Sequence, residues 1–230
     1  NSPHNPTGGV LTRADLESVA EIAKDRDLWV ISDEAYEDIV YDGAEHVSIA
    51  SLPGMYERVV PVYTFSKSFA MTGLRLGYVA VHSPVVQERV TKLIGYTVSN
   101  VSTLIQWGGI GGLEVPPNWL DTFRMELQLR RDLFYTGVAR LNGVFTGTPP
   151  KGAFFAFVRI DDGWEPPSGL QAGASRSWAM AERLIQEANV GCIPGVEFGA
   201  QGEDHIRFCF SRELDELKRA LEAMRTLLDS

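Results

Sequence analysis

Residues 28–34 read Leu-Trp-Val-Ile-Ser-Asp-Glu, a short apolar run that ends abruptly in polar residues. A run of this length and composition is typical of a buried strand in a parallel sheet. Before it, Thr12 and Asp15 have the spacing of a helix capping box, and apolar residues then recur at helical intervals as far as Ala23. This stretch therefore predicts a helix and then a buried strand, whose polar end carries Asp33.

The chain continues this alternation of short apolar runs and helical segments. Residues 59–65 and 76–81 predict two further strands, although Pro61 cannot donate a hydrogen bond within the first of them, and residues 84–96 predict a helix. Residues 108–112 are rich in glycine but lack the Lys-Ser or Lys-Thr of a phosphate loop, so they favour close helix packing. Short strands separated by helices predict an α/β fold built on a mainly parallel sheet.

The pattern changes after Pro116-Pro117. The segments expected there are a long amphipathic helix from Trp119 to Leu141, strands at 153–160 and 206–210, a polar loop at 161–175, and helices at 178–189 and 214–228. We therefore expect two domains, a larger α/β domain over residues 1–116 and a smaller α+β domain over residues 117–230.

Composition and charge exclude several classes of protein. The 230 residues are 44% hydrophobic and 22% charged, as in ordinary globular domains. A net charge of −9 leaves no excess of positive charge to displace counterions from a nucleic acid, and no run of 18 apolar residues predicts a membrane span. Two cysteines without CxxC spacing and four scattered histidines indicate neither a metal site nor a disulfide framework, and a cytoplasmic setting is the default.

Side chains that can carry chemistry follow the expected strand ends, where open parallel sheets bind their ligands. They are Asn5 in the opening loop, Asp33 and Tyr36 after the first strand, Thr64, Ser66 and Lys67 after the second, and Arg75 a little further on. Together they supply an amide, a carboxylate, a phenol, hydroxyls, an amine and a guanidinium. This inventory suits a cofactor that bears a carbonyl, a phosphate and a basic ring nitrogen.

Each of these residues also has an ordinary interpretation. A single lysine is most often a solvated surface residue, and an aspartate after a strand is often a helix N-cap. The ordinary roles of the remaining residues are packing for Tyr36, backbone hydrogen bonding for Thr64 and Ser66, structural charges for Arg75 and Arg207, and turn chemistry for Asn5. A tight loop beside a ligand would instead favour a cis bond between Asn5 and Pro6. Only the surrounding pattern separates the two kinds of interpretation.

That pattern lies in Asn5-Pro6-Thr7-Gly8, in Asp33-Glu34-Ala35-Tyr36 and in the segment from Ser66 to Tyr78, which reads Ser-Lys-Ser-Phe-Ala-Met-Thr-Gly-Leu-Arg-Leu-Gly-Tyr. These segments resemble the signatures of the class I/II aminotransferases, fold-type I enzymes that use pyridoxal 5′-phosphate (PLP). Residues 194–199 and 206–208 resemble the C-terminal signature of the same family. The resemblance extends over nearly the whole chain, and its order and spacing make it specific.

The resemblance implies a fold-type I enzyme that moves an amino group between an α-amino acid and a 2-oxo acid. Lys67 would form the Schiff base with PLP and carry the proton at the substrate Cα, and a buried Asp33 would pair with the pyridine nitrogen. The remaining implied contacts are Tyr36 and Asn5 to the ring oxygen, Thr64 and Arg75 to the phosphate, and Arg207 to the substrate α-carboxylate. Ser66 is expected to bind the cofactor, and Asn5 is expected to bind the substrate as well.

Two departures from the family pattern affect these expectations. Thr64 stands where Ser or Gly is more usual, and the family's preceding segment, with its phosphate loop, stacking aromatic and subunit contacts, is not found. We therefore expect an N-terminally truncated chain that binds PLP weakly and turns over poorly, from a protein that is a homodimer when intact. The sequence also leaves open PLP-dependent elimination or C–S lysis, the sensor domain of a transcription regulator, and an inert fragment. It does not identify the amino acid or the oxo acid.

Overall fold

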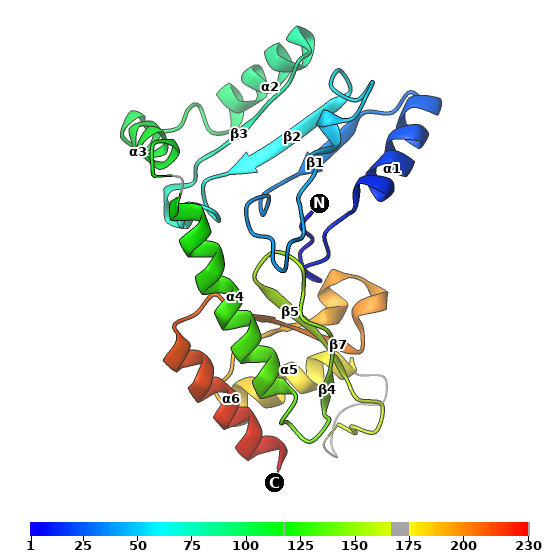
Figure 1. Cartoon of the computed structure of the whole chain (residues 1–230), viewed down its shortest axis with the longest axis vertical. Coiled ribbons are helices and arrows are strands. Elements are labelled where there is room, and N and C mark those ends of the chain that lie inside the picture. The colour runs from blue at the N-terminus through cyan, green and yellow to red at the C-terminus, as the bar shows by residue number, and fades with distance from the viewer. Residues whose placement is uncertain (117, 167–174, 230) are drawn as a thin grey trace. The chain divides into compact units, whose positions relative to one another are not determined.

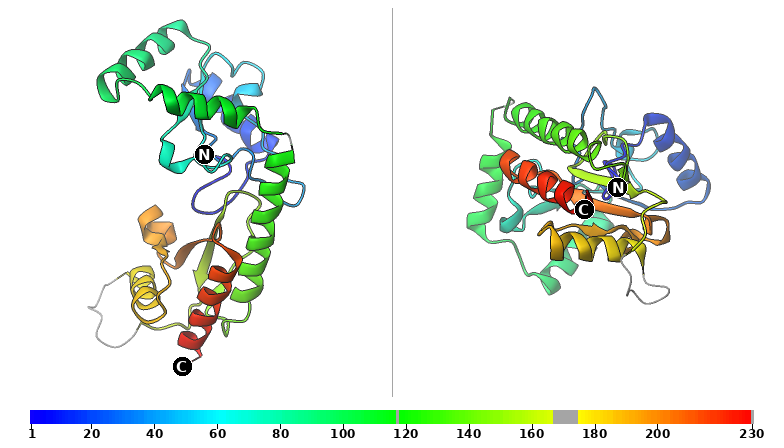
Figure 2. Two further views of the ribbon diagram at one scale, coloured as in Figure 1. Left: turned by 90° about the vertical axis from the view of Figure 1, so that its left-hand side faces the viewer. Right: turned by 90° about the horizontal axis from the view of Figure 1, so that it is seen from below.

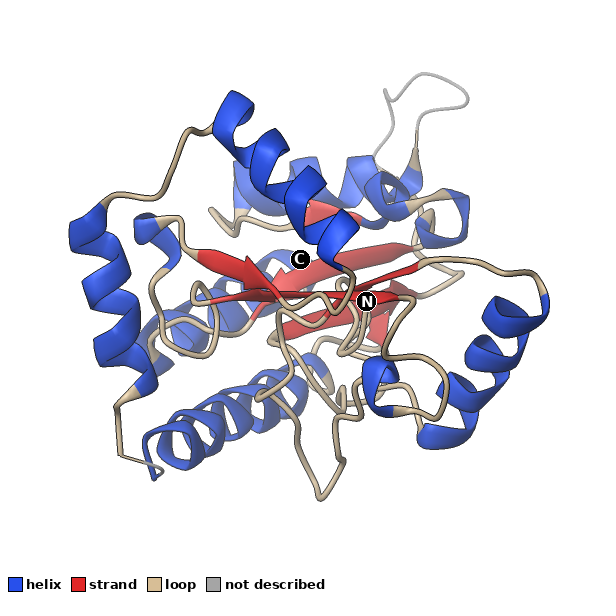
Figure 3. Ribbon diagram, turned by 90° about the horizontal axis from the view of Figure 1, so that it is seen from above, coloured by secondary structure: helices blue, strands red, loops and turns tan. Residues whose placement is uncertain are grey.

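The computed structural model describes residues 1–116, 118–166 and 175–229 (Figure 1). The chain divides into two compact units, the first made of Asn1–His4 with Gly9–Arg124 and the second of Asn5–Gly8 with Met125–Ser230. Both units combine helices with strands, which Figure 3 distinguishes by colour, as expected for an α/β protein. The division falls inside a helix, whereas the sequence pattern placed the domain boundary before that helix, at residue 116.

The first unit contains three strands and a set of helices. Its elements are α1 (Arg13–Asp25), β1 (Val30–Asp33), β2 (Val59–Thr64), β3 (Gly77–Val79), α2 (Pro84–Thr97), α3 (Thr103–Leu113), and 3-10 turns at Ile49–Ser51 and Thr72–Leu74. The strand order is β1-β2-β3, with β1 and β2 parallel and β2 and β3 antiparallel. Among the described strands of this unit the sheet is therefore mixed rather than mainly parallel.

The core of the first unit lies between α1 and the sheet. The predicted capping box is confirmed, because Thr12 accepts from the backbone of Asp15 while the Asp15 carboxylate accepts from the backbone of Thr12. Leu16, Ala20 and Ala23 of α1 are buried. They form one cluster with Ile49, Leu52, Met55 and Val59, against which Val30 packs.

The expected buried strand at residues 28–31 is only partly confirmed. The strand begins at Val30, and Leu28, Trp29 and Ile31 are exposed, Ile31 by 77%. Successive side chains of a strand point to opposite faces. Val30 thus packs on the α1 cluster, whereas Ile31 points to the other face, where no described part of the chain covers it.

The helices α2 and α3 differ in how their residues are used. α2 buries none of its residues, and a cavity of about 530 Å³ lies between Val90 and Ile94 on this helix and the strands β2 and β3. In α3, Gly109 and Gly112 are buried, and a Cβ on Gly109 would overlap the side chain of Leu76. The predicted close packing is therefore confirmed at Gly109 and Gly112, whereas a Cβ on Gly111 would meet no atom of the described chain outside its own helix within 4 Å.

The second unit is built on an antiparallel sheet. Its elements are the part of α4 (Asn118–Val138) that starts at Met125, then β4 (Phe145–Thr146), β5 (Phe155–Ile160), α5 (Arg176–Glu187), β6 (Ile193–Pro194), β7 (His205–Cys209) and α6 (Leu214–Leu228), with strand order β4-β5-β7-β6. α4 and α6 lie side by side (Figure 2), where Gly137 faces Leu221. Most of the expected polar loop, residues 167–174, lies outside the described residues.

In the described part of the chain, every helix is too short or too polar to cross a lipid bilayer.

Candidate active site

The ends of β1 and β2 bring two groups of predicted residues to one edge of the sheet. Asp33 is the last residue of β1 and Thr64 the last of β2, and the two strands are parallel neighbours. Lys67 follows in the turn after β2, and its Nζ lies 5.5 Å from the centre of the Tyr36 ring. Tyr36 is buried and Lys67 is half-buried. The structure therefore places the predicted amine and phenol together.

The turn that carries Lys67 is held by backbone hydrogen bonds. Phe65 donates to the carbonyl of Leu76 at 3.1 Å and accepts from the amide of Met71 at 3.2 Å. The Thr72 hydroxyl donates to the carbonyl of Ser66 at 2.9 Å, and Ser66 is itself buried. These bonds fix the backbone on both sides of Lys67.

Thr64 and Arg75, two of the residues expected at the phosphate, both contact the backbone of this turn. The Thr64 hydroxyl donates to the carbonyl of Leu76 at 3.3 Å and accepts from the amide of Ser66 at 3.1 Å. Arg75 is exposed and has a left-handed backbone, with φ of 56°, and its Nη1 donates to the carbonyl of Thr72 at 3.1 Å.

Asp33 is exposed, so the expectation of a buried carboxylate was wrong. The reason is its place at the end of a strand on the outer edge of the described sheet. Its Oδ1 accepts from the amide of Ala35 at 3.1 Å, and its carbonyl accepts from the amide of Ser2 at 3.3 Å. These bonds hold the carboxylate close to the start of the turn that leads to Tyr36.

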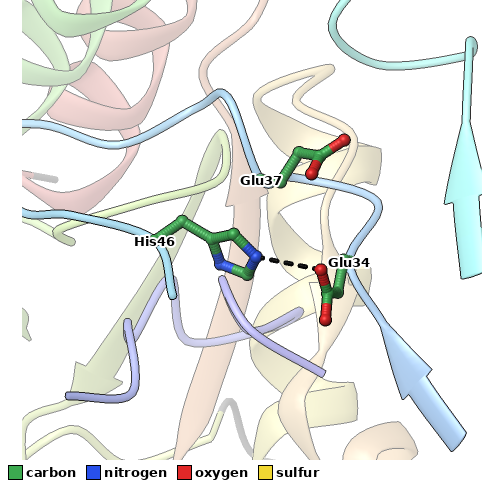
Figure 4. Close-up of side chains that lie close together, drawn as sticks. All are labelled: Glu34, Glu37 and His46. Carbon is green, nitrogen blue, oxygen red and sulfur yellow. Dashed lines mark hydrogen bonds and ion pairs between the residues drawn. The ribbon is translucent and has the colours of Figure 1, made fainter. Parts of the chain in front are cut away.

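The buried carboxylate at this edge belongs to Glu34, which the sequence analysis did not single out. Its side chain is 1% exposed. Oε1 accepts from Ser48 at 2.7 Å and from Ser32 at 2.9 Å, and Oε2 accepts from His46 Nε2 at 3.2 Å (Figure 4). Burial alone would raise the pKa of Glu34, but the hydrogen bonds from these three residues and the charge of His46 outweigh it, so the pKa lies below its ordinary value.

Glu37 is the third member of the group shown in Figure 4. The possible ligand atoms of Glu34, Glu37 and His46 lie within 4.8 Å of one another. Burial, helped by the charges of Asp38 and Glu34, raises the pKa of Glu37 to about 7. No spacing in the sequence indicates this group, because His46 is separated from Glu34 by a turn of irregular structure.

The other predicted residues, Asn5 and Arg207, meet in the second unit. Arg207 on β7 donates from Nη1 to Asn5 Oδ1 at 2.9 Å. Its guanidinium carbon lies 4.4 Å from the centre of the Phe155 ring and 4.8 Å from that of Phe198. Planar guanidinium groups stack well on aromatic faces, so the two rings restrict the orientation of the Arg207 fork. The Asn5–Pro6 peptide bond is cis.

Comparison with known proteins identifies the class. Residues 1–224 match the profile of the family Aminotransferase class I and II, and the chain belongs to this family. The resemblance inferred from the motifs is thereby confirmed.

Individual relatives include the aspartate aminotransferase of Pyrococcus abyssi, 41% identical over 99% of this chain, and aromatic-amino-acid aminotransferase 2 of Thermococcus litoralis, 40% identical over 99%. The crystal structure of an aromatic aminotransferase from Pyrococcus horikoshii OT3 covers all of this chain at 40% identity with a TM-score of 0.88. The chain spans 56% of the length of each of those two relatives and 58% of the chain in that crystal structure.

Proposed function

We propose that this chain contributes the lysine-bearing part of the active site of a PLP-dependent aminotransferase, which moves an amino group between an α-amino acid and a 2-oxo acid. The observation that carries the proposal is the position of Lys67 Nζ, 5.5 Å from the centre of the Tyr36 ring, at the sheet edge where β1 and β2 end. Membership of the aminotransferase family supports it.

The donor set at this edge fits PLP. Lys67 offers a primary amine for the aldehyde, and the exposed carboxylate of Asp33 is accessible to a ring nitrogen. The Tyr36 phenol suits the ring oxygen, and the Arg75 guanidinium suits a phosphate, because charge-assisted hydrogen bonds from arginine are strong and directional. Thr64 and Ser66 would add hydroxyls there, and the Thr64 hydroxyl would first have to turn away from the carbonyl of Leu76. Bound there, PLP would supply an electron-withdrawing ring for the charge left at the substrate Cα.

Side chains of this chain would then move the proton and bind the substrate. The Lys67 amine would take the proton from the substrate Cα and deliver it to C4′ of the cofactor, the carbon that bore the aldehyde. Asp33 would keep a proton on the ring nitrogen. Arg207, oriented by Asn5 and by its two aromatic neighbours, would bind the substrate α-carboxylate through two of its three guanidinium nitrogens, which a lysine could not do.

Trapping on lysine tests the cofactor proposal directly. The purified chain is incubated with a series of PLP concentrations, reduced with borohydride, and digested for mass spectrometry. We expect the pyridoxyl group on Lys67 at PLP concentrations that leave the exposed Lys92 unmodified. A Lys67→Ala variant should lose this early product and a Lys92→Ala variant should keep it. Equal labelling of the two lysines would refute the proposal.

Substrates and assembly complete the proposal. The names of the relatives favour aspartate and aromatic amino acids as amino donors, and the oxo acid formed from each can be measured with 2-oxoglutarate as acceptor. We expect poor turnover from this chain alone, since it spans 56% of those relatives. The whole protein would be a homodimer, which light scattering after size-exclusion chromatography would detect.

A further inference from the structure

We infer that Glu34 is a positioning residue for Lys67 and Tyr36: its buried carboxylate and its backbone amide together hold the ends of the two strands that lead to them. The inference rests on the proposed function, because it concerns the same site. It assigns a role to a residue that makes no expected contact with the cofactor.

The first step is the position of Glu34 in the chain. It stands between Asp33 and Tyr36, and its backbone continues the contact with β2, since its amide donates to the carbonyl of Val62 at 3.0 Å. The carbonyl of Glu34 accepts from the amide of Glu37 at 3.1 Å and so closes the turn that holds Tyr36. Movement of Glu34 would therefore displace Tyr36.

The second step is the set of donors around the carboxylate. Ser32 comes from β1, whereas His46 and Ser48 come from the segment that leads to the next helical turn. Three donors on a side chain that is 1% exposed leave little freedom for it to change rotamer. Both Glu34 oxygens already accept hydrogen bonds in this way, one of them from His46 (Figure 4), so we interpret Glu34 and its three donors as a hydrogen-bonded network rather than as a cation site.

The third step connects the network to β2. The Tyr63 phenol lies near Ser48 and Glu34, since burial and the charge of Glu34 raise the pKa of Tyr63 and Ser48 also affects it. Tyr63 immediately precedes Thr64, and its ring stacks on Tyr78 of β3 with the centroids 4.9 Å apart. Glu34 thus holds the end of β1 through Ser32, bonds to β2 through its amide at Val62, and has its carboxylate near Tyr63 of β2.

The test compares Glu34→Gln with the wild-type chain and with Glu45→Gln, an exposed glutamate in the same region. Glutamine keeps the shape of Glu34 but loses its charge, and its amide nitrogen cannot accept as an oxygen does. The first readout is amide hydrogen exchange in residues 33–37 and 64–70, with α6 as the internal reference. The second is the rate at which trinitrobenzenesulfonate modifies Lys67 relative to Lys92, which needs no cofactor.

We expect Glu34→Gln to speed exchange in those two segments by about tenfold, the size expected from weakened hydrogen bonds to a charged group, and to leave α6 unchanged. The Lys67-to-Lys92 modification ratio should change by several-fold, whereas Glu45→Gln should leave both readouts at their wild-type values. If Glu34→Gln does not fold, Ser48→Ala removes a single donor and is measured in its place, with the same expectations.

Two results would overturn the inference. One is wild-type exchange and a wild-type modification ratio in Glu34→Gln, and the other is faster exchange everywhere, which a purely structural role would produce. Failure of the proposed function is a different result, because it would appear in the wild-type chain as PLP labelling of Lys67 and Lys92 alike. Both cofactor-free readouts on Glu34 would still stand in that case.

Discussion

The variant Glu37→Gln should be more stable than the wild type at pH 8 and as stable as the wild type at pH 4. Burial raises the pKa of Glu37 to about 7 in the folded chain, against an ordinary value of 4.5. Between these two values the folded state therefore holds its proton more tightly than the unfolded chain does. The free energy of unfolding of the wild type must fall as the pH rises through this window, and it stays lower above it.

The magnitude follows from the size of the shift. A change from 4.5 to about 7 would correspond to about 3 kcal/mol at the usual conversion. Glu37 keeps partial contact with solvent, which screens the charge, so we reduce the expected effect to about 1–2 kcal/mol. Glutamine carries no charge at any pH and resembles the protonated glutamate in shape. The variant should thus gain this amount at pH 8 and gain nothing at pH 4.

Urea unfolding followed by circular dichroism at the two pH values measures this difference. Glu45→Gln is the control, since it removes one negative charge from an exposed residue of the same region. An equal effect of Glu37→Gln at both pH values would refute the reasoning, and so would a variant less stable than the wild type at pH 8.

Three further predictions concern other parts of the chain. Gly8→Ala should destabilise the second unit by about 2–4 kcal/mol in thermal unfolding, because φ is +66° and a Cβ would lie 2.6 Å from the carbonyl oxygen of Gly152. Thr12→Ala should cost about 1 kcal/mol, since it removes the side chain that caps α1, and the same melting experiment checks it. Burial raises the pKa of Cys192 to about 12, so at pH 8 only about 0.01% of it is thiolate and iodoacetamide should label the exposed Cys209 first; faster labelling of Cys192 would contradict this.

The fold could be predicted where local chemistry and burial agree. Thr12 and Asp15 mark the start of α1 because the capping contacts lie within one turn of the chain. Exposure of Ile31 could not be predicted, because an apolar run does not reveal whether both faces of its strand are covered. The strands β4 and β6 have two residues each and therefore show no periodicity at all.

The candidate site was predictable as far as its motifs reached. The motifs selected Lys67 with Tyr36 and Asn5 with Arg207, and the structure brings each pair together. The role of Glu34 was not predictable, because its partners are common residue types at positions set by an irregular loop. Its neighbour Asp33 was expected to be the buried acid. Successive residues at the end of a strand face opposite sides, and the sequence does not show whether Asp33 or Glu34 faces the interior.

The exposed surface of α2 has a practical consequence. None of its side chains is buried, and Val85 and Leu93 are 59% and 62% exposed. A helix that gains so little from packing opens at low cost, since most helical stability in proteins comes from burial of one face. Limited digestion with chymotrypsin should therefore cleave the chain near Tyr96 before it cleaves the buried part of α4. The exposed apolar side chains of α2 would also promote aggregation of concentrated samples.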